Sequence, residues 1–590
     1  MKRILILLAV ALMATAAFAQ TPKDTFVADM FASIDTLDPA QAYDTSSSWV
    51  IQNVYQTLYT YKGASAKDFV PQLATSYKVS EDGTTYTFTL RKGVTFHNGD
   101  PFTCADVAYS IKRAVITNNA QSGDWILAEP LSGYGSNAND ALGKNATDAD
   151  YHKYFQTVDS SVTCPDPYTA VFHLASPSPT FFARMLFSAA SIIDKKWAIE
   201  NGQWDGTEAT WKKWIGYDLH NNSYLQDHMN GTGPYEMVQW VPGQKFVAKA
   251  YAGYWGDQPA IKNVLINRDK EVSTRILNLQ KGNADYIDLG SRADVKQVEG
   301  SQGVKVWNLD GKLGWSEAAA DAVFLNEKIT ADNNPNIGSG KLDGNGIPPD
   351  FFANQDVRLC FSYAFDRQAY IQQVELGQAK KITMALPSNF LGYDPNIPTY
   401  SLDLEKATQH CKAAFDGKLW SNGFKMTLLY NTGNTARQTA VEILKSNLEY
   451  INPKFQITTR GVAWPDFIKQ ASQHTMPAYA LGWLADYADP DDFIHVFYAK
   501  GGYYADQIGF SNPQINQLDQ QARTETNPEA RKLLYSQIGH LAHQLEPIIL
   551  LPGGGLPAAP GCGRHGVIRT CSHSFFGASS IFRWCSSASR

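Results

Sequence analysis

Four aspartates occur close together in residues 482–498, GWLADYADPDDFIHVFY: Asp486, Asp489, Asp491 and Asp492. Clustered carboxylates can ligate calcium, or serve as the acid and base of a glycoside hydrolase. The glycine and glutamate of an EF-hand calcium loop are missing here, which favours solvated carboxylates over a calcium site. Asp489 and the proline after it are expected to fix the turn that follows.

Asp486 has a third possible role, as the partner of a cation on a bound ligand. A carboxylate in a dry cleft stabilises a ligand ammonium through a charge-assisted hydrogen bond, whereas an unpaired buried charge is costly. Trp483 and Tyr487 flank Asp486 and would wall such a cleft. Spacing alone favours a solvated or helix-capping carboxylate, so the ligand-binding role needs a further argument.

The chain has 590 residues, too many for one compact core, which predicts two or three domains. Its net charge of −6 and the lack of a basic stripe argue against a nucleic-acid binder. A basic start, a short apolar run and an A-x-A cleavage site predict a signal peptide over residues 1–19, and no later membrane-spanning run follows. We therefore expect a secreted protein of the periplasm.

The segment 71–113 combines strand, turn and helix signals. Apolar and polar residues alternate around Tyr77 and again after an Asp-Gly turn, so two half-buried strands are expected. Thr103 and Asp106 form an S/T-x-x-D/E capping box, and the apolar residues after it recur at helical spacing. Residues 117–160 are polar and rich in loop-forming residues, and predict a surface insertion.

The string LATSYKVSEDGTTYTFTLRKGVTFHNGDPFTCADVAYSIKR within this segment resembles the hallmark of the family 5 extracytoplasmic solute-binding proteins of peptide-type ABC importers. That family includes oligopeptide, dipeptide and nickel binders. Three further blocks resemble it: GTGPYEMVQWVPGQKFVAKAYAGYWG at 231–256, DVRLCFSYAFDRQAY at 356–370, and the aspartate-rich block at 482–498. The resemblance covers residues 24–550, nearly the whole chain.

The resemblance implies an α/β fold, the bilobal periplasmic-binding-protein fold of type II. In its large family 5 form, this fold has an extra subdomain in the larger lobe. The larger lobe would take residues 20–310, with the subdomain at 71–195, and the smaller lobe would take residues 311–550. The ligand would bind between the lobes, and hinge closure would bury it.

The function implied is that of the periplasmic substrate-binding component of an ABC importer, with no catalytic activity, cofactor or metal. It would act as a monomer, capturing a small peptide and delivering it to a membrane permease driven by a separate ATPase. In peptide binders the aspartate that matches Asp486 pairs with the peptide α-amino group, and Trp483 and Tyr487 lie beside it. No residue can be matched to the ligand's carboxyl end.

Two alternatives stay open. One is the same transport role with a nickel chelate or an oligosaccharide as the ligand, because relatives with such ligands share the block around Asp486. The other is a secreted glycoside hydrolase, in which the aspartates would act as paired catalytic carboxylates.

Seven cysteines in a secreted chain favour disulfide bonds. Four lie in the body of the chain, and the sequence alone allows three pairings among them. A bond confined to one lobe does not oppose closure of the lobes. We therefore predict the pairs Cys104–Cys164 and Cys360–Cys411.

Residues 551–590 form an anomalous tail. Glu546 is the last acidic residue, and the chain after it has no helical or strand periodicity. The family would continue here with a segment that returns to the larger lobe. Three explanations are possible: a real cysteine-rich tail, a disordered extension, or a coding frame that slipped after residue 551. The abrupt change of composition favours the slipped frame. That hypothesis predicts no structural pair among the tail cysteines, Cys562, Cys571 and Cys585.

Overall fold

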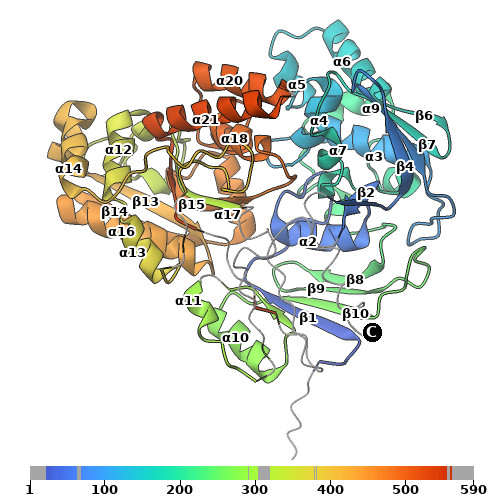
Figure 1. The fold of residues 1–590 in the computed structure, drawn as a ribbon, viewed down its shortest axis with the longest axis horizontal. Helices are drawn as coiled ribbons and strands as arrows, with labels where there is room; N and C mark the ends of the chain where they lie inside the picture. The colour runs from blue at the N-terminus through green and yellow to red at the C-terminus, as the bar shows by residue number, and fades with distance from the viewer. Residues whose placement is uncertain are drawn as a thin grey trace, which may run out of the picture.

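The computed structural model describes residues 21–62, 68–289, 292–302, 304, 319–377, 379, 382–525, 527–553 and 559–560. The predicted signal peptide, the predicted crossing near residue 310 and the three tail cysteines lie outside these residues. Figure 1 shows two masses of helices and strands. We call them the larger lobe, residues 21–302, and the smaller lobe, residues 319–553.

The larger lobe is built on a six-stranded sheet with the order β17-β11-β1-β10-β9-β8. Strand β1 runs parallel to β10 and β11, while β9 is antiparallel to both of its neighbours. The two residues of β17 pair with β11, so this short piece of the tail lies at the edge of the larger sheet. The strands are β1 (Thr25–Met30), β8 (Tyr235–Val241), β9 (Lys245–Ala250), β10 (Asn263–Arg268), β11 (Tyr286–Ile287) and β17 (Ala559–Pro560).

A four-stranded sheet with the order β4-β5-β7-β6 forms a separate layer of the larger lobe, at the right of Figure 1. The alternating apolar residues of β5 are buried, as predicted. Tyr77 of β4 is 40% exposed instead of half-buried, because β4 is an edge strand with a neighbour on one side only. The strands are β4 (Ala74–Val79), β5 (Thr85–Leu90), β6 (Val162–Asp166) and β7 (Thr169–His173).

The predicted capping box is present: Thr103 and Asp106 begin helix α3 (Cys104–Thr117), which packs against this sheet. The prediction of a loop-rich insertion after α3 was wrong, because three helices follow. Their polar residues cap helix ends; Asn137, for example, accepts a hydrogen bond from the amide of Asp140. The helices are α4 (Trp125–Ser132), α5 (Ala138–Leu142) and α6 (Asp148–Ser161), and every residue of α4 except Glu129 is buried.

The smaller lobe has a mixed five-stranded sheet with the order β14-β13-β15-β12-β16. Strand β13 is parallel to β14 and β15, and β12 is antiparallel to β15 and β16. The strands are β12 (Ala319–Leu325), β13 (Phe424–Asn431), β14 (Phe455–Val462), β15 (Ala478–Leu484) and β16 (Ile548–Leu550). The helices around the sheet are α12 (Gln355–Ala364), α13 (Arg367–Gln373), α14 (Leu404–Ala413), α15 (Lys418–Asn422), α16 (Thr435–Ile451) and α17 (Trp464–Ser472).

Four helices of the smaller lobe follow β15 in the chain, and Figure 1 shows α18, α20 and α21 between the sheet of this lobe and the four-stranded layer. They are α18 (Asp491–Tyr498), α19 (Tyr503–Gln507), α20 (Pro513–Thr524) and α21 (Pro528–Leu545). The remaining elements of the larger lobe are short, apart from α2 and α10: α2 (Thr45–Val54), β2 (Tyr59–Tyr61), β3 (Phe69–Pro71), α7 (Phe181–Arg184), α8 (Lys195–Glu200), α9 (Glu208–Trp211), α10 (Val272–Lys281) and α11 (Arg292–Val295).

Both predicted disulfides are present. Cys104–Cys164 joins α3 to β6, and Cys360–Cys411 joins α12 to α14. Each bond therefore connects two elements of the same lobe, and neither bond links the lobes to each other.

Candidate functional site

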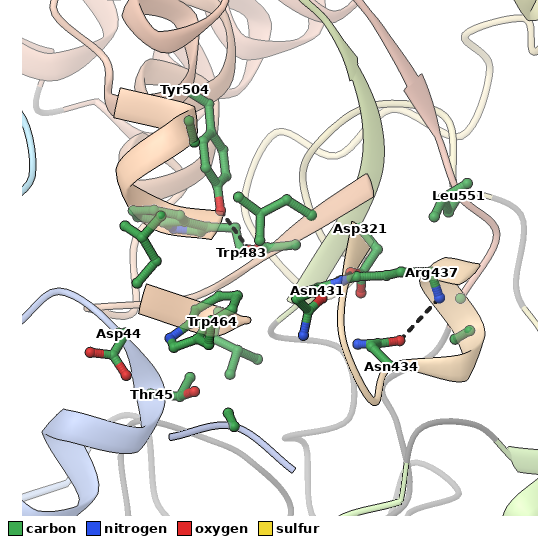
Figure 2. Close-up of a pocket in the computed structure, with 18 of the residues that line it drawn as sticks. Asp44, Thr45, Asp321, Asn431, Asn434, Arg437, Trp464, Trp483, Tyr504 and Leu551 are labelled. Carbon is green, nitrogen blue, oxygen red and sulfur yellow. Dashed lines mark hydrogen bonds and ion pairs between the residues drawn. The ribbon is translucent and has the colours of Figure 1, made fainter. Parts of the chain in front are cut away.

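A cavity of about 200 Å³ lies between the two lobes and is lined by both. The larger lobe contributes the start of α2 and the loops after β1 and β11. The smaller lobe contributes β15 and parts of α16, α17 and α19. Figure 2 shows side chains of both lobes facing one another across this space. A concave, largely apolar site with a few polar groups is suited to binding a small ligand.

Asp486 lies in the wall of this cavity, in the turn between β15 and α18, and is 5% exposed. Its Oδ2 accepts a hydrogen bond of 2.7 Å from the hydroxyl of Tyr43, on the larger lobe. The indole N–H of Trp125 donates to that hydroxyl at 3.0 Å. The backbone N–H of Asp486 donates to Asp492 Oδ2 at 2.6 Å. The aspartate singled out from the sequence therefore lies at a contact between the lobes.

Two carboxyl groups of the cavity have raised pKa values. Burial raises the pKa of Asp486 to about 8, although the hydrogen bond from Tyr43 opposes this effect. Burial raises the pKa of Asp44 to about 6, and the nearby negative charge of Asp35 adds to the rise. A ligand cation beside either carboxyl group would favour its ionised form.

Trp483 lines the cavity, whereas Tyr487 is not among the described residues that line it. The ring of Trp483 packs edge-on against Tyr43, with 5.6 Å between the ring centres. The hydroxyl of Tyr487 lies 3.1 Å from both carboxylate oxygens of Asp491, and the guanidinium of Arg184 lies over its ring. Tyr487 therefore contacts Asp491 and Arg184, and its place in the wall of the cleft stays a prediction.

The other aspartates of the cluster each have their own partner. Asp489 accepts a hydrogen bond from the amide of Asp491, which confirms its role in the turn, and pairs with Arg531. Asp491 pairs with Arg184, and Asp492 accepts a hydrogen bond from the backbone N–H of Asp486. The four carboxylates do not converge on one cation. No group of three or more His, Cys, Asp or Glu side chains in the described part of the chain is placed to hold a metal.

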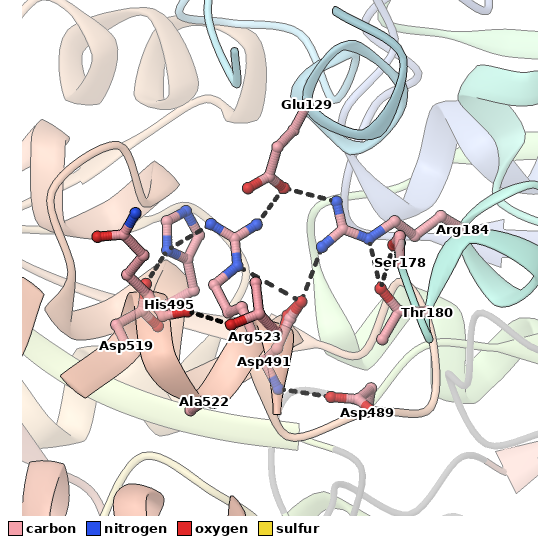
Figure 3. Close-up of polar contacts among 12 residues, drawn as sticks. Glu129, Ser178, Thr180, Arg184, Asp489, Asp491, His495, Asp519, Ala522 and Arg523 are labelled. Atoms are coloured by element: carbon pink, nitrogen blue, oxygen red, sulfur yellow. Dashed lines mark hydrogen bonds and ion pairs between the residues drawn. The ribbon is translucent and has the colours of Figure 1, made fainter. Parts of the chain in front are cut away.

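Four charged side chains join the lobes beside the cavity, and we call them the cross-lobe charge network (Figure 3). They are Glu129 and Arg184 of the larger lobe and Asp491 and Arg523 of the smaller lobe. Arg184 donates to Glu129 and to Asp491, each at 2.7 Å, and Arg523 donates to Glu129. Burial alone would raise the pKa of both acids, but the two guanidinium charges lower it, so both stay ionised.

Arg437 is a lining residue that the sequence analysis missed. Among the described lining residues it is the only arginine or lysine. Its Nε and Nη2 donate to Asp321 Oδ1 at 3.1 and 2.9 Å, and its Nη1 donates to Asn431. A Cβ on Gly482 would lie 2.2 Å from Asp321 Oδ1 and 2.7 Å from Arg437 Nη2, so this glycine makes room for the ion pair. No local spacing signals a pair that joins β12 to α16.

Asp44 is a second lining residue that the sequence analysis missed. It is the N-cap of α2, and its Oδ1 accepts hydrogen bonds of 3.0 Å from the amides of Ser46 and Ser47. Its Oδ2 is buried and makes no hydrogen bond of ordinary geometry, although the side chain of Trp464 lies close enough to lower the pKa of the carboxyl group. An aspartate before three serines and an apolar stretch is a typical start of a helix. That pattern locates the cap but not the cavity on its other side.

Comparisons with known proteins agree with this architecture. Residues 68–505 match the family model of the bacterial extracellular solute-binding proteins, family 5 Middle. The chain is 25% identical over 530 residues to the dipeptide-binding protein of Escherichia coli K12, covering 86% of this chain and 84% of that protein. It is 25% identical over 519 residues to heme-binding protein A of Haemophilus influenzae, covering 86% and 82%.

A solved structure has the same fold. It is the ABC transporter-associated periplasmic binding protein DppA from Helicobacter pylori in complex with the peptide STSA. The TM-score is 0.72 at 22% identity, over 95% of this chain and 97% of that chain. Among the helices of the described residues, none has the length and apolar character needed to cross a bilayer.

Two lobes with a cavity between them are typical of a protein that binds a small ligand. The chain belongs to family 5 of the bacterial extracellular solute-binding proteins. It is thus an extracytoplasmic substrate-binding protein of an ABC importer, and a permease is its partner. Proteins of this family bind and do not catalyse, so the glycoside hydrolase alternative is excluded.

Proposed function

We propose that the ligand is a small peptide, captured between the lobes in the periplasm and delivered to the permease. Asp486 holds its α-ammonium, Arg437 holds its carboxylate, and Trp483 packs against it. The observation that carries this proposal is the buried carboxyl group of Asp486 in the cavity wall. Burial raises its pKa, and a cation that binds beside it would lower the pKa and favour the ionised form. The dipeptide-binding relative and the relative solved with the peptide STSA support the same ligand class.

Other ligands fit these charges less well. A neutral oligosaccharide would leave Asp486 without a cation, so its carboxyl group would stay largely protonated at neutral pH and form no ion pair with the ligand. The heme named for one relative brings carboxylates into a cavity that is already lined by several acids. A zwitterionic peptide, in contrast, supplies a partner for Asp486 and for Arg437 at once.

Titration calorimetry with dipeptides and tripeptides, each with a free or an N-acetylated amino terminus, tests the proposal. We expect binding of the free peptides and a loss of about 100-fold in affinity on acetylation or in Asp486→Asn. Asp257→Asn, which changes an exposed carboxylate, is the matched control and should bind as the wild type does. Equal affinity for acetylated and free peptides would refute the role of Asp486. Mass spectrometry of the purified protein that finds only chelates, heme or sugars would refute the peptide ligand.

A further inference from the structure

Asp44 offers the cavity more than a helix cap requires. One oxygen of a Ser, Thr or Asn side chain is enough to accept the amides at a helix start. Asp44 does this with Oδ1, while Oδ2 is buried in the lining of the cavity and makes no hydrogen bond of ordinary geometry, although the side chain of Trp464 lies close enough to lower the pKa of the carboxyl group. The residue is 5% exposed. A buried charged oxygen without a donor is costly unless a ligand supplies one.

The charge balance of the cavity points to a cation as that ligand group. The described lining residues include five acids, Asp44, Asp288, Asp321, Glu375 and Asp486, and one base, Arg437. Arg437 already gives two N–H groups to Asp321. A peptide with one ammonium and one carboxylate would leave this excess of negative charge unchanged. A ligand with a further positive charge would reduce it.

The surroundings of Asp44 suit a long cationic side chain. Figure 2 shows Asp44 on the larger lobe facing the ring of Trp464 on the smaller lobe. The alkyl stem of a lysine or arginine packs well on an indole ring, and a guanidinium can stack on it. Asp44 interacts electrostatically with Asp35 and His220, which lie 3.2 Å apart and pair with each other.

We propose that the cavity selects peptides with a second positive charge, on a lysine- or arginine-type side chain, and that Asp44 pairs with that charge. This inference depends on the proposed peptide function and names the substrate class of the same site. Asp486 takes the α-ammonium, Asp44 takes the side-chain cation, and the ring of Trp464 covers the stem between them.

Calorimetry at pH 7.5 with matched tripeptides tests the inference on the full-length protein. Lysine is placed in turn at each of the three positions of an alanine tripeptide, and each lysine is compared with norleucine, which has the same stem without the charge. The wild type should prefer lysine by about tenfold at one position, as expected for a charge-assisted hydrogen bond. Asp44→Asn keeps the cap and removes the charge, and its preference should fall to within about twofold.

The controls separate this role from a general loss of structure. Asp35→Asn changes the carboxylate next to Asp44 that does not line the cavity, and it should keep the lysine preference. In Asp35→Asn, affinity for the norleucine peptides should stay within about twofold of the wild type. If Asp44→Asn does not fold, Asp44→Ser also retains a capping oxygen and replaces it in the test.

The outcomes distinguish this inference from the proposed function. If lysine and norleucine peptides bind the wild type equally, or if Asp44→Asn keeps the lysine preference, the role of Asp44 is refuted and the peptide function stands. If no peptide of the set binds the wild type, the peptide function fails and this inference fails with it.

Discussion

Arg184 donates a hydrogen bond of 2.7 Å to Asp491, and this contact joins α7 of the larger lobe to α18 of the smaller lobe. The two side chains are 3% and 2% exposed. Neither residue is among the described lining residues of the cavity. The cross-lobe charge network can therefore hold the two lobes together without contacting the ligand, and we expect it to stabilise a closed form.

Glu129→Gln should weaken ligand binding although Glu129 does not line the cavity. Glu129 accepts hydrogen bonds from both Arg184 and Arg523, so its negative charge reduces the repulsion between the two guanidinium groups. The two arginines belong to different lobes, so this repulsion would act only when the lobes are together. We expect the affinity for peptide to fall by about tenfold. Small-angle scattering should show a larger radius of gyration for the ligand-free variant. Glu529→Gln, at an exposed carboxylate of α21, is the control, and unchanged affinity in Glu129→Gln would contradict a role in closure.

Asp486→Asn should stabilise the ligand-free protein at high pH. Because the folded-state pKa of Asp486 is about 8, the folded protein binds a proton more tightly than the unfolded chain does. The contribution of Asp486 to stability is therefore lost as the pH rises from about 4 to 8. In urea unfolding, the free energy of unfolding of the variant minus that of the wild type should be larger at pH 8 than at pH 5 by ~4 kcal/mol. Asp257→Asn should show no such trend, and parallel curves for Asp486→Asn and the wild type would rule out this explanation.

Removing the Cys360–Cys411 bond should lower stability but not affinity. The double variant Cys360→Ala, Cys411→Ala removes the covalent bond between α12 and α14 in the smaller lobe. It should reduce the free energy of unfolding by ~2–4 kcal/mol. Peptide affinity should change by less than about twofold, because the bond does not cross the cleft. A large loss of peptide affinity at an unchanged free energy of unfolding would contradict this prediction.

Gly482→Ala should damage recognition of the peptide carboxylate. The added Cβ would collide with the ion pair of Asp321 and Arg437, and one of these side chains would have to move. We expect a loss of about tenfold for peptides with a free carboxylate and little change for their C-terminal amides. Gly135→Ala, where an added Cβ meets nothing within 4 Å, is the control. An equal loss for acids and amides would instead indicate general distortion of the cavity.

The hypothesis of a slipped coding frame after residue 551 stays a prediction. Two residues of the tail, 559 and 560, pair with the larger sheet, and the three tail cysteines lie outside the described residues. Peptide mapping without reduction should find Cys562, Cys571 and Cys585 unpaired. Resequencing the 3′ end of the gene is the direct test, and an intact frame would refute the hypothesis.

Patterns confined to short stretches of sequence predicted much of the fold. The capping box at Thr103 and the buried alternation in β5 depend on spacing within a few residues, and the structure has both. The segment 117–160 was misjudged because Asn, Asp and Gly favour helix ends as well as loops. The disulfide pairing was also correct, since each bond had to stay within one lobe.

The sequence by itself determined the family of the protein and singled out Asp486, because each of the motifs that resemble the family is a continuous stretch of the chain. Only the tertiary structure decided which other groups meet that aspartate in the cavity. Arg437 pairs with Asp321 across 116 positions, and Arg523 reaches Glu129 across 394. Contacts over such separations depend on how the sheets and helices pack, and local spacing carries no record of that packing.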